Sequence, residues 1–291
     1  MLCLTKRVVA KVKRSGWKAA FKAFGQVIHA KLFPTRWDFD LVPKTLEDIL
    51  AQKASLTIVQ IGANVGKTEN DQLWKFFTKH CVSDSSTSQK IRAILIEPVS
   101  HLYDQLARNY AGYQGLSCLR AAVAECEGTK TFYRLREGLD LAACGLPPYA
   151  EQLGSFLREN MASLAVNDPK NPKLLEFINA NIIEELIPCL TLEKILEQNG
   201  MRELDFLQVD TEGYDYHILR SIDFTRHAPR YINYERIHLH TDEAPCRRLL
   251  LRHGYVLHDH GQDTFCLLGG RRGLGKQLAD RLYNAWLDAI N

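Results

Sequence analysis

The sequence predicts an α/β protein with a mostly parallel sheet and helices on both faces, and three observations predict it. Short apolar runs at 56–61, 91–96 and 206–209 are typical of strands buried on both faces. Each run is followed by a turn and then by a stretch with the apolar spacing of a helix. Acidic side chains stand directly after the second and third runs, where a doubly wound sheet forms its ligand crevice.

Composition sets the outer limits. The chain has 291 residues, of which 46% are apolar and 24% charged, which suits one large domain with an extension. No apolar run approaches the ~20 residues of a membrane span. Eight scattered cysteines without a C-x-x-C pair predict reduced thiols in a cytoplasmic protein rather than disulfides or a zinc site.

The charge is unevenly distributed along the chain. Residues 1–36 carry nine Lys and Arg and no acid, whereas the remainder carries 28 basic and 34 acidic residues. Residues 37–291 are therefore net acidic, and the main domain (43–291) gives no support to nucleic-acid binding. Within the extension (1–42), residues 5–33 predict a basic amphipathic helix that Pro34 ends. That helix either contacts an anionic membrane peripherally or packs its apolar stripe on the domain, and we favour packing.

The first predicted strand ends in the glycine turn Gly62-Ala63-Asn64-Val65-Gly66, and a helix is expected over 67–80. The turn has one residue too few for a P-loop and lacks the G-x-G-x-x-G dinucleotide pattern. Since both of those motifs bind phosphates, a nucleoside ligand without pyrophosphate, such as S-adenosylmethionine, fits better. A purely structural glycine turn is the alternative.

The second predicted strand is closed by Glu97 and Pro98. An acid at this position of a doubly wound sheet accepts hydrogen bonds from the ribose hydroxyls of a bound nucleoside. The alternative is that Glu97 interacts with the N-terminus of the helix expected over 100–110.

The remaining elements follow from periodicity and turn residues. Strands are expected over 116–123, 129–135 and 231–235, with an antiparallel pair at 255–258 and 264–268. Helices are expected over 45–52 (capped by Thr45 with Asp48), 150–161, 172–186, 192–198, 214–222, 246–253 and 276–290. The irregular region 136–190 is expected to form the substrate wall.

Candidate catalytic residues follow the last two parallel strands. Asp210 is the preferred general base, and Glu235 with His238 forms a second set that would act as base partner or as ligands. Glu212 either caps the following helix or contacts substrate together with Tyr214. A divalent metal among these carboxylates is the alternative to a general base, and the base is favoured.

Several motifs in order resemble the FkbM-like family of S-adenosylmethionine-dependent methyltransferases. They are VQIGANVG (59–66), LIEPV (95–99), AAVAECEGTKTFY (121–133), PCLTLEKIL (188–196), LDFLQVDTEGYDYHIL (204–219) and YER (234–236). The resemblance implies a class I methyltransferase Rossmann-like fold, with a mostly parallel seven-stranded sheet and an antiparallel closing strand. It further implies O-methylation of a hydroxyl on a sugar, glycan or polyketide-type metabolite.

The resemblance also implies cofactor contacts. Gly62, Asn64 and Gly66 would hold the methionine part and Glu97 the ribose. The other residues expected to border the cofactor are Gln60, Ala63, Pro98, Ala122 and Asp210. Gln60 stands where many members carry an acid. Two alternatives remain, namely an inactive methyltransferase-like module that binds a partner, and an enzyme that modifies nucleotide sugars.

Overall fold

The computed structural model describes residues 41–269 apart from 69–70, 83–86, 144–145, 147–149, 151 and 166–171. The helices expected over 5–33 and 276–290, and nearly all of the predicted extension, lie outside the described residues. Peripheral membrane contact through 5–33 therefore stays a prediction. No helix within the described ranges is long and apolar enough to cross a membrane.

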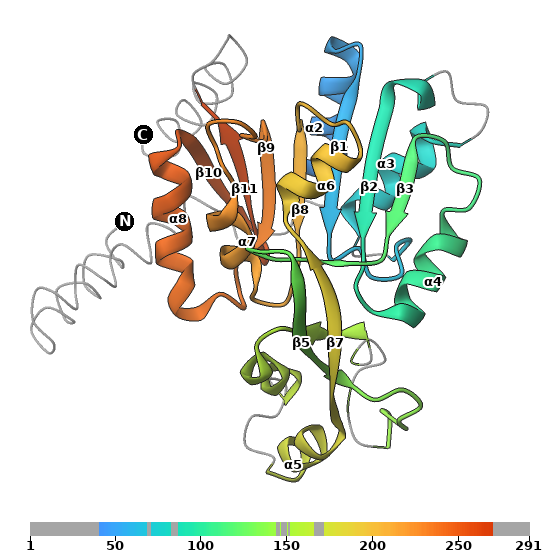
Figure 1. The fold of residues 1–291 in the computed structure, drawn as a ribbon, viewed down its shortest axis with the longest axis vertical. Helices are drawn as coiled ribbons and strands as arrows, with labels where there is room; N and C mark the ends of the chain where they lie inside the picture. The colour runs from blue at the N-terminus through green and yellow to red at the C-terminus, as the bar shows by residue number, and fades with distance from the viewer. Residues whose placement is uncertain are drawn as a thin grey trace, which may run out of the picture.

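A seven-stranded sheet organises the molecule, in the order β10-β11-β9-β8-β1-β2-β3 (Figure 1). Its strands are β1 Leu56–Ile61, β2 Ile91–Ile96, β3 Leu116–Leu119, β8 Phe206–Val209, β9 Tyr231–Glu235, β10 Tyr255–His260 and β11 Asp263–Leu268. β11 runs antiparallel to both of its neighbours, whereas β3, β2, β1, β8 and β9 pair in parallel. This confirms the predicted fold class.

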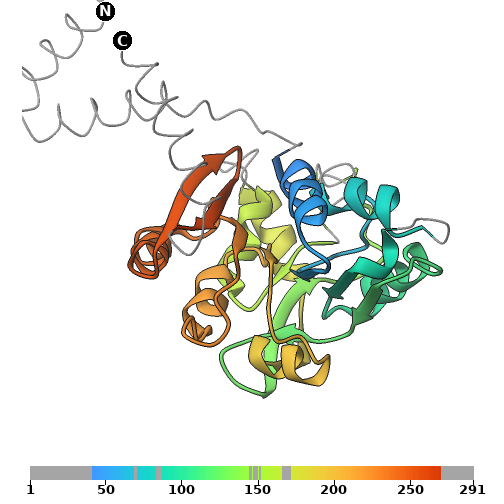
Figure 2. The same ribbon diagram turned by 90° about the horizontal axis from the view of Figure 1, so that it is seen from above.

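Helices cover both faces of this sheet (Figures 1 and 2). They are α2 Leu41–Gln52, α3 Gln72–His80, α4 Ser100–Asn109, α6 Leu192–Gln198, α7 Asp215–Ser221 and α8 Glu243–Arg252. Side chains alternate along a strand, so Ile58 packs with the α2 and α3 side chains while Val59 packs with those of α6, α7 and α8. The two resulting apolar cores explain why the strand sequences are almost continuously hydrophobic.

Three helices begin elsewhere than expected. α3 begins at Gln72 rather than at 67, because Asn64, Gly66 and Lys67 all have positive φ and Asp71 caps the helix by accepting from the Leu73 N–H. α2 begins at Leu41, before the predicted Thr45. The Thr45 hydroxyl donates to the Leu41 carbonyl inside the helix, so the predicted Thr45 cap is wrong. α8 begins at Glu243 rather than at Cys246.

The region between β3 and α6 forms a second sheet that the sequence did not predict, in the order β4-β7-β5-β6. Its strands are β4 Ala122–Val123, β5 Gly128–Leu135, β6 Gly154–Ser155 and β7 Ile182–Leu190. The strand expected over 116–123 is therefore divided between the two sheets. Figure 1 shows the long β5–β7 ribbon reaching away from the main sheet.

Two helix predictions in this region are wrong in whole or in part. The helix expected over 172–186 is shorter than predicted, because α5 Pro172–Asn181 ends where β7 begins. β7 pairs antiparallel with β5, and Glu185 forms an ion pair with Arg134 of β5 at 2.9 Å. The helix expected over 150–161 is replaced by β6 and a 3-10 helix, η3 Arg158–Ala165.

Candidate functional site

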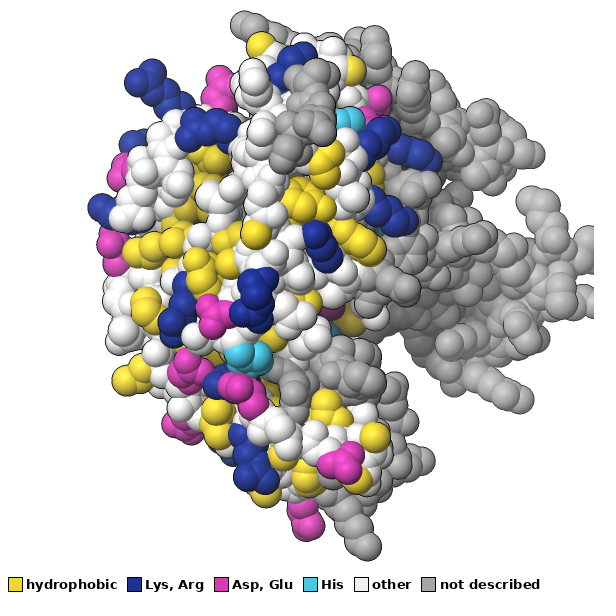
Figure 3. Space-filling model, turned by 90° about the vertical axis from the view of Figure 1, so that its right-hand side faces the viewer, with side chains coloured by type: hydrophobic (Ala, Val, Ile, Leu, Met, Phe, Trp, Pro, Cys, Tyr) yellow, Lys and Arg dark blue, Asp and Glu magenta, His cyan; other side chains and the backbone are white. Residues whose placement is uncertain are grey.

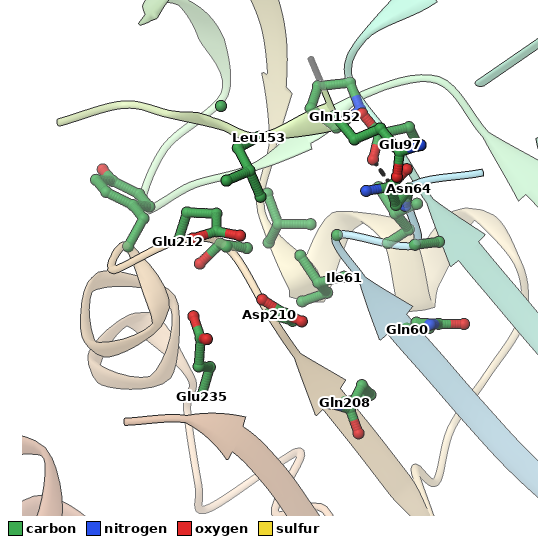
Figure 4. A pocket seen from close by; sticks show the side chains of 18 of the residues that line it. Gln60, Ile61, Asn64, Glu97, Gln152, Leu153, Gln208, Asp210, Glu212 and Glu235 are labelled. Atoms are coloured by element: carbon green, nitrogen blue, oxygen red, sulfur yellow. Dashed lines mark hydrogen bonds between the residues drawn. The ribbon is translucent and has the colours of Figure 1, made fainter. Parts of the chain in front are cut away.

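A pocket of about 610 Å³ opens at the carboxyl ends of β1, β2, β8 and β9. One wall comes from Phe132 and Gly154 of the second sheet and from Leu153, which directly precedes β6. Figure 4 shows Leu153 above the cavity. Among the described residues that line the pocket there is no Lys or Arg, but six side chains are acidic: Asp71, Glu97, Asp210, Glu212, Glu235 and Asp263. This charge balance favours a ligand that carries positive charge.

The glycine turn holds the β1 and β8 ends together. Gly62 has φ +78°, and a Cβ there would lie 1.7 Å from the Asp210 carbonyl oxygen. Gly66 has φ +59° and a Cβ there would lie 2.4 Å from the Tyr110 ring. Gly66 faces this ring and is not among the residues that line the pocket, contrary to its expected cofactor contact. The backbone conformation and close packing at both positions therefore require glycine, whether or not a ligand binds.

Glu97 lies at the glycine-loop end of the pocket, which we define by Gly62, Ala63, Asn64, Glu97 and Pro98. Its two carboxylate oxygens accept from the backbone N–H groups of Asn64 and Val99, each at 2.9 Å. Burial raises the pKa of Glu97 to about 7. Because Val99 is the N-cap residue of α4, Glu97 fixes both the loop and the start of α4 while it lines the pocket.

Beside this end, four polar side chains lie around the start of α3. Gln60 donates to Asp71 at 3.4 Å, and Gln72 donates to Asp263 at 3.0 Å. Within the described part of the chain, Gln60 Oε1 and Gln72 Oε1 are buried without a hydrogen-bond partner. Burial raises the pKa of Asp71 to about 6. Gln60, Gln72 and Asp71 together offer hydrogen-bond acceptors to a positively charged donor.

The opposite end, which we call the carboxylate end, consists of Asp210, Glu212, Glu235 and His238. His238 Nε2 lies 3.4 Å from a Glu212 oxygen and 3.8 Å from a Glu235 oxygen. Burial and the charge of Asp215 raise the pKa of Glu212 to about 7, and burial together with Asp210 raises that of Glu235. Burial lowers the pKa of His238, which favours the neutral imidazole.

Asp210 borders the cavity directly. Its side chain is exposed to the pocket, yet protein encloses it otherwise, and this confinement with the charges of Glu212 and Asp215 raises its pKa. In Figure 4 its carboxylate lies between Glu212, Glu235 and the β1 end at Ile61. β8 pairs with β1, so Asp210 lies directly beside the glycine turn.

Side-chain hydrogen bonds to the Glu212 carbonyl hold the loop that carries Glu212. Glu212 has φ +53°, and its carbonyl accepts from Ser155 Oγ at 3.0 Å and from Asn160 Nδ2 at 2.6 Å. α7 starts after Tyr214, and the Glu212 carboxylate faces His238 rather than the helix, so the capping interpretation of Glu212 is wrong. The Tyr214 ring borders the pocket while its hydroxyl contacts Glu125 and Lys130.

Asp215 was not singled out from the sequence. It is fully buried, and its carboxylate accepts from the Thr211 hydroxyl at 2.8 Å and from the Glu235 N–H at 3.3 Å. Asp215 therefore ties the β8 loop to the end of β9 and fixes Glu212 relative to Glu235.

The structure brings the other expected site residues together. All but Gly66 border this one pocket: Gln60, Gly62, Ala63, Asn64, Glu97, Pro98, Ala122, Asp210, Glu212, Tyr214, Glu235 and His238. Sequence reasoning missed Asp71, Gln72, Gln152, Gln208 and Asp263, which also line it. Asp71 precedes the apolar spacing of α3 and was recognisable as a helix cap, whereas no local pattern points to Asp263.

The distribution of charged side chains on the surface bears on nucleic-acid binding. On the face in Figure 3, the acidic and basic side chains of the described residues are interspersed, without an extended basic patch there. That the protein does not bind nucleic acid remains a prediction.

Comparison with known proteins identifies a family. The model of the methyltransferase FkbM domain matches residues 60–257, which include every pocket position from Gln60 to His238. A solved precorrin-6y C5,15-methyltransferase from Geobacter metallireducens GS-15 is similar at 9% identity, over 78% of this chain and 85% of that chain, with a TM-score of 0.35. The latter likeness is too weak to inform function. No curated protein matches the sequence.

Proposed function

Because the chain belongs to the FkbM methyltransferase family, we propose that it transfers a methyl group from S-adenosylmethionine to a hydroxyl of a small-molecule or glycan acceptor. The observation that supports this most is the division of one pocket between two acidic ends. The glycine-loop end suits the nucleoside, and the carboxylate end suits the acceptor. An acceptor on a sugar or polyketide-type metabolite is proposed from the family resemblance.

The residues present fit S-adenosylmethionine, which supplies a methyl group on a positively charged sulfur when bound. Glu97 retains acceptor capacity on both carboxylate oxygens for ribose hydroxyls, because each oxygen accepts only one backbone bond. Gln60 Oε1 and Gln72 Oε1 are unpartnered acceptors within the described residues, beside the Asp71 carboxylate. These three residues suit an α-ammonium group, with Asp71 supplying the negative charge that Gln60 lacks.

The carboxylate end suits removal of a proton from the acceptor. Asp210 is proposed as the general base because its carboxylate faces the cavity beside the β1 end. Phe132, Leu153 and Phe156 give that side of the cavity an apolar wall against which an acceptor can be aligned. Alignment of the acceptor oxygen with the methyl carbon is the main contribution of such a site to the rate.

Calorimetric titration of the protein with S-adenosylmethionine, S-adenosylhomocysteine, NAD and ATP tests the cofactor. We expect the first two to bind and the phosphate-bearing ligands to bind much more weakly, since the pocket is acidic and lacks both phosphate motifs. Tight binding of NAD with no response to S-adenosylhomocysteine contradicts the proposal.

A second measurement tests turnover. Radiolabelled methyl transfer to a panel of sugars, glycans and polyketide-type hydroxyl compounds is expected to label at least one class. Binding of S-adenosylhomocysteine without turnover of any hydroxyl acceptor would favour the inactive binding module.

A further inference from the structure

Three side chains at the carboxylate end converge on one point. Glu212, Glu235 and His238 each offer one ligand atom, and these atoms all lie within 4.8 Å of one another. The separations from His238 Nε2 are 3.4 Å to Glu212 and 3.8 Å to Glu235. Ligand atoms that share an ion at about 2.1 Å lie roughly 3.0–3.4 Å apart, so a small adjustment would suffice for an ion to bind.

A second observation concerns Glu235, which has a buried carboxylate oxygen without a partner among the described residues. Glu235 is only 8% exposed, and its Oε2 is buried without a hydrogen-bond partner among the described residues. Figure 4 shows its side chain directed from β9 toward Glu212 and Asp210. A buried carboxylate oxygen without a partner is costly, and a bound cation would remove that cost.

No Lys or Arg side chain of the described residues lines the pocket around these three ligands. Asp210, Asp215 and Asp263 add to the negative charge around Glu235. His238 Nε2 faces both glutamates, and an imidazole nitrogen is a common metal ligand.

We propose that Glu212, Glu235 and His238 bind a divalent first-row transition metal ion. Two carboxylate oxygens and one imidazole nitrogen suit ions of the Mn²⁺ kind, which accept both ligand types. Three protein ligands leave coordination positions open toward the pocket.

The use of those open positions rests on the proposed function. An acceptor hydroxyl that ligates the ion loses its proton more readily, and Asp210 receives that proton. The oxygen then forms its bond to the methyl carbon as the carbon–sulfur bond breaks, and the electron pair of that bond remains on sulfur. The site would thus favour acceptors that bring a hydroxyl, or two adjacent hydroxyls, to the metal.

Titration of the metal-free, full-length protein with Mn²⁺, followed by electron paramagnetic resonance of the free ion, tests the site without cofactor or acceptor. One saturable ion per chain is expected. Glu235→Gln and Glu212→Gln should each weaken binding by about tenfold or more, since even supporting residues of metal sites contribute 10–100-fold. Glu212 lies on a loop, so its variant remains informative if the buried Glu235 variant does not fold.

The matched control is Asp71→Asn, which removes a pocket carboxylate beside α3 and should leave Mn²⁺ affinity within about twofold. Absence of saturable Mn²⁺ binding, or equal loss in Asp71→Asn and Glu212→Gln, overturns the proposal. Titration of the same sample with S-adenosylhomocysteine separates the two proposals. Mn²⁺ binding without S-adenosylhomocysteine binding contradicts the proposed function alone, and the reverse contradicts the metal site alone.

Discussion

Glu97 and Glu235 are buried acids at the two ends of the pocket, and they differ in how many hydrogen bonds they accept. Glu97 receives a backbone N–H on each of its carboxylate oxygens. Glu235 has an oxygen without a partner among the described residues, and burial together with the charge of Asp210 raises the pKa of Glu235. Glu97 and Glu235 are buried to a similar extent, at 5% and 8% exposed, so the two residues differ in hydrogen bonding rather than in burial.

This contrast separates recognition from chemistry. A carboxylate fixed by backbone donors keeps its position and binds a ligand without rearranging, which suits a cofactor that returns in every cycle. Crowded carboxylates without donors hold a proton or a cation readily, which suits the end where a proton must move. Variants at one end should therefore change binding, and variants at the other end should change turnover.

The largest effect is expected at the carboxylate end. Asp210→Asn should lower the rate of methyl transfer by the ~10²–10⁴-fold typical of a lost general base. Its dissociation constant for S-adenosylhomocysteine should change less than about threefold, because the amide retains the size of the side chain. The measurements are single-turnover kinetics and calorimetry, with the exposed Asp223→Asn as the control. Full activity in Asp210→Asn would show that Asp210 is not the general base.

The next effect is expected at the glycine-loop end. Glu97→Ala should weaken S-adenosylhomocysteine binding by about tenfold or more, since hydrogen bonds to charged groups contribute ~1.5–3 kcal/mol. The rate at saturating cofactor should fall much less than in Asp210→Asn. Calorimetry measures the affinity, and circular dichroism checks that the loop and α4 remain folded. An unchanged dissociation constant in a folded variant would restrict Glu97 to holding Asn64 and Val99.

A smaller effect is expected at Asp71, beside the glycine-loop end, and it should distinguish two parts of the cofactor. Asp71→Asn should weaken S-adenosylhomocysteine binding by about fivefold, because a neutral acceptor forms a hydrogen bond of roughly half the strength of a charged one. Binding of 5′-methylthioadenosine, which lacks the amino-acid part, should be unaffected. Glu97→Ala should weaken both ligands and serves as the contrast. Equal weakening of both ligands by Asp71→Asn would show that Asp71 acts through the stability of α3.

The main sheet was predictable because its signal is local. β1 and β2 are each apolar along most of their length, and the predicted bounds of β2 and β9 match the structure. Of the second sheet, β5 was predicted as the strand over 129–135, whereas β7 was not predictable from local pattern. β7 continues directly from a helix, and its sequence IIEELIPCL becomes a strand only through pairing with β5, about 50 residues earlier in the chain.

The site divides in the same way. Glu97, Asp210 and Glu235 follow parallel strands, whose carboxyl ends meet at one edge of the sheet, so their proximity was predictable. Gln72 and Asp263 meet at 3.0 Å although 191 residues separate them. Their meeting depends on how α3 and β11 pack, and no spacing in the sequence encodes that distance.

The smallest expected effect is a pH dependence that belongs to the glycine-loop end alone. The pKa of Glu97 is raised to about 7 by burial, so the folded protein without ligand holds Glu97 largely protonated below that pH. Ribose hydroxyls donate more strongly to the ionised carboxylate, hence S-adenosylhomocysteine affinity should rise as pH rises through about 7. Between pH 6 and pH 8 we expect a gain of about threefold in wild type beyond that in Glu97→Gln, whose side chain does not titrate. The other pocket carboxylates titrate in both proteins and cancel in this comparison. Parallel pH profiles of the two dissociation constants would show that the ligand does not sense the charge of Glu97, and the contrast between the two ends would then rest on turnover alone.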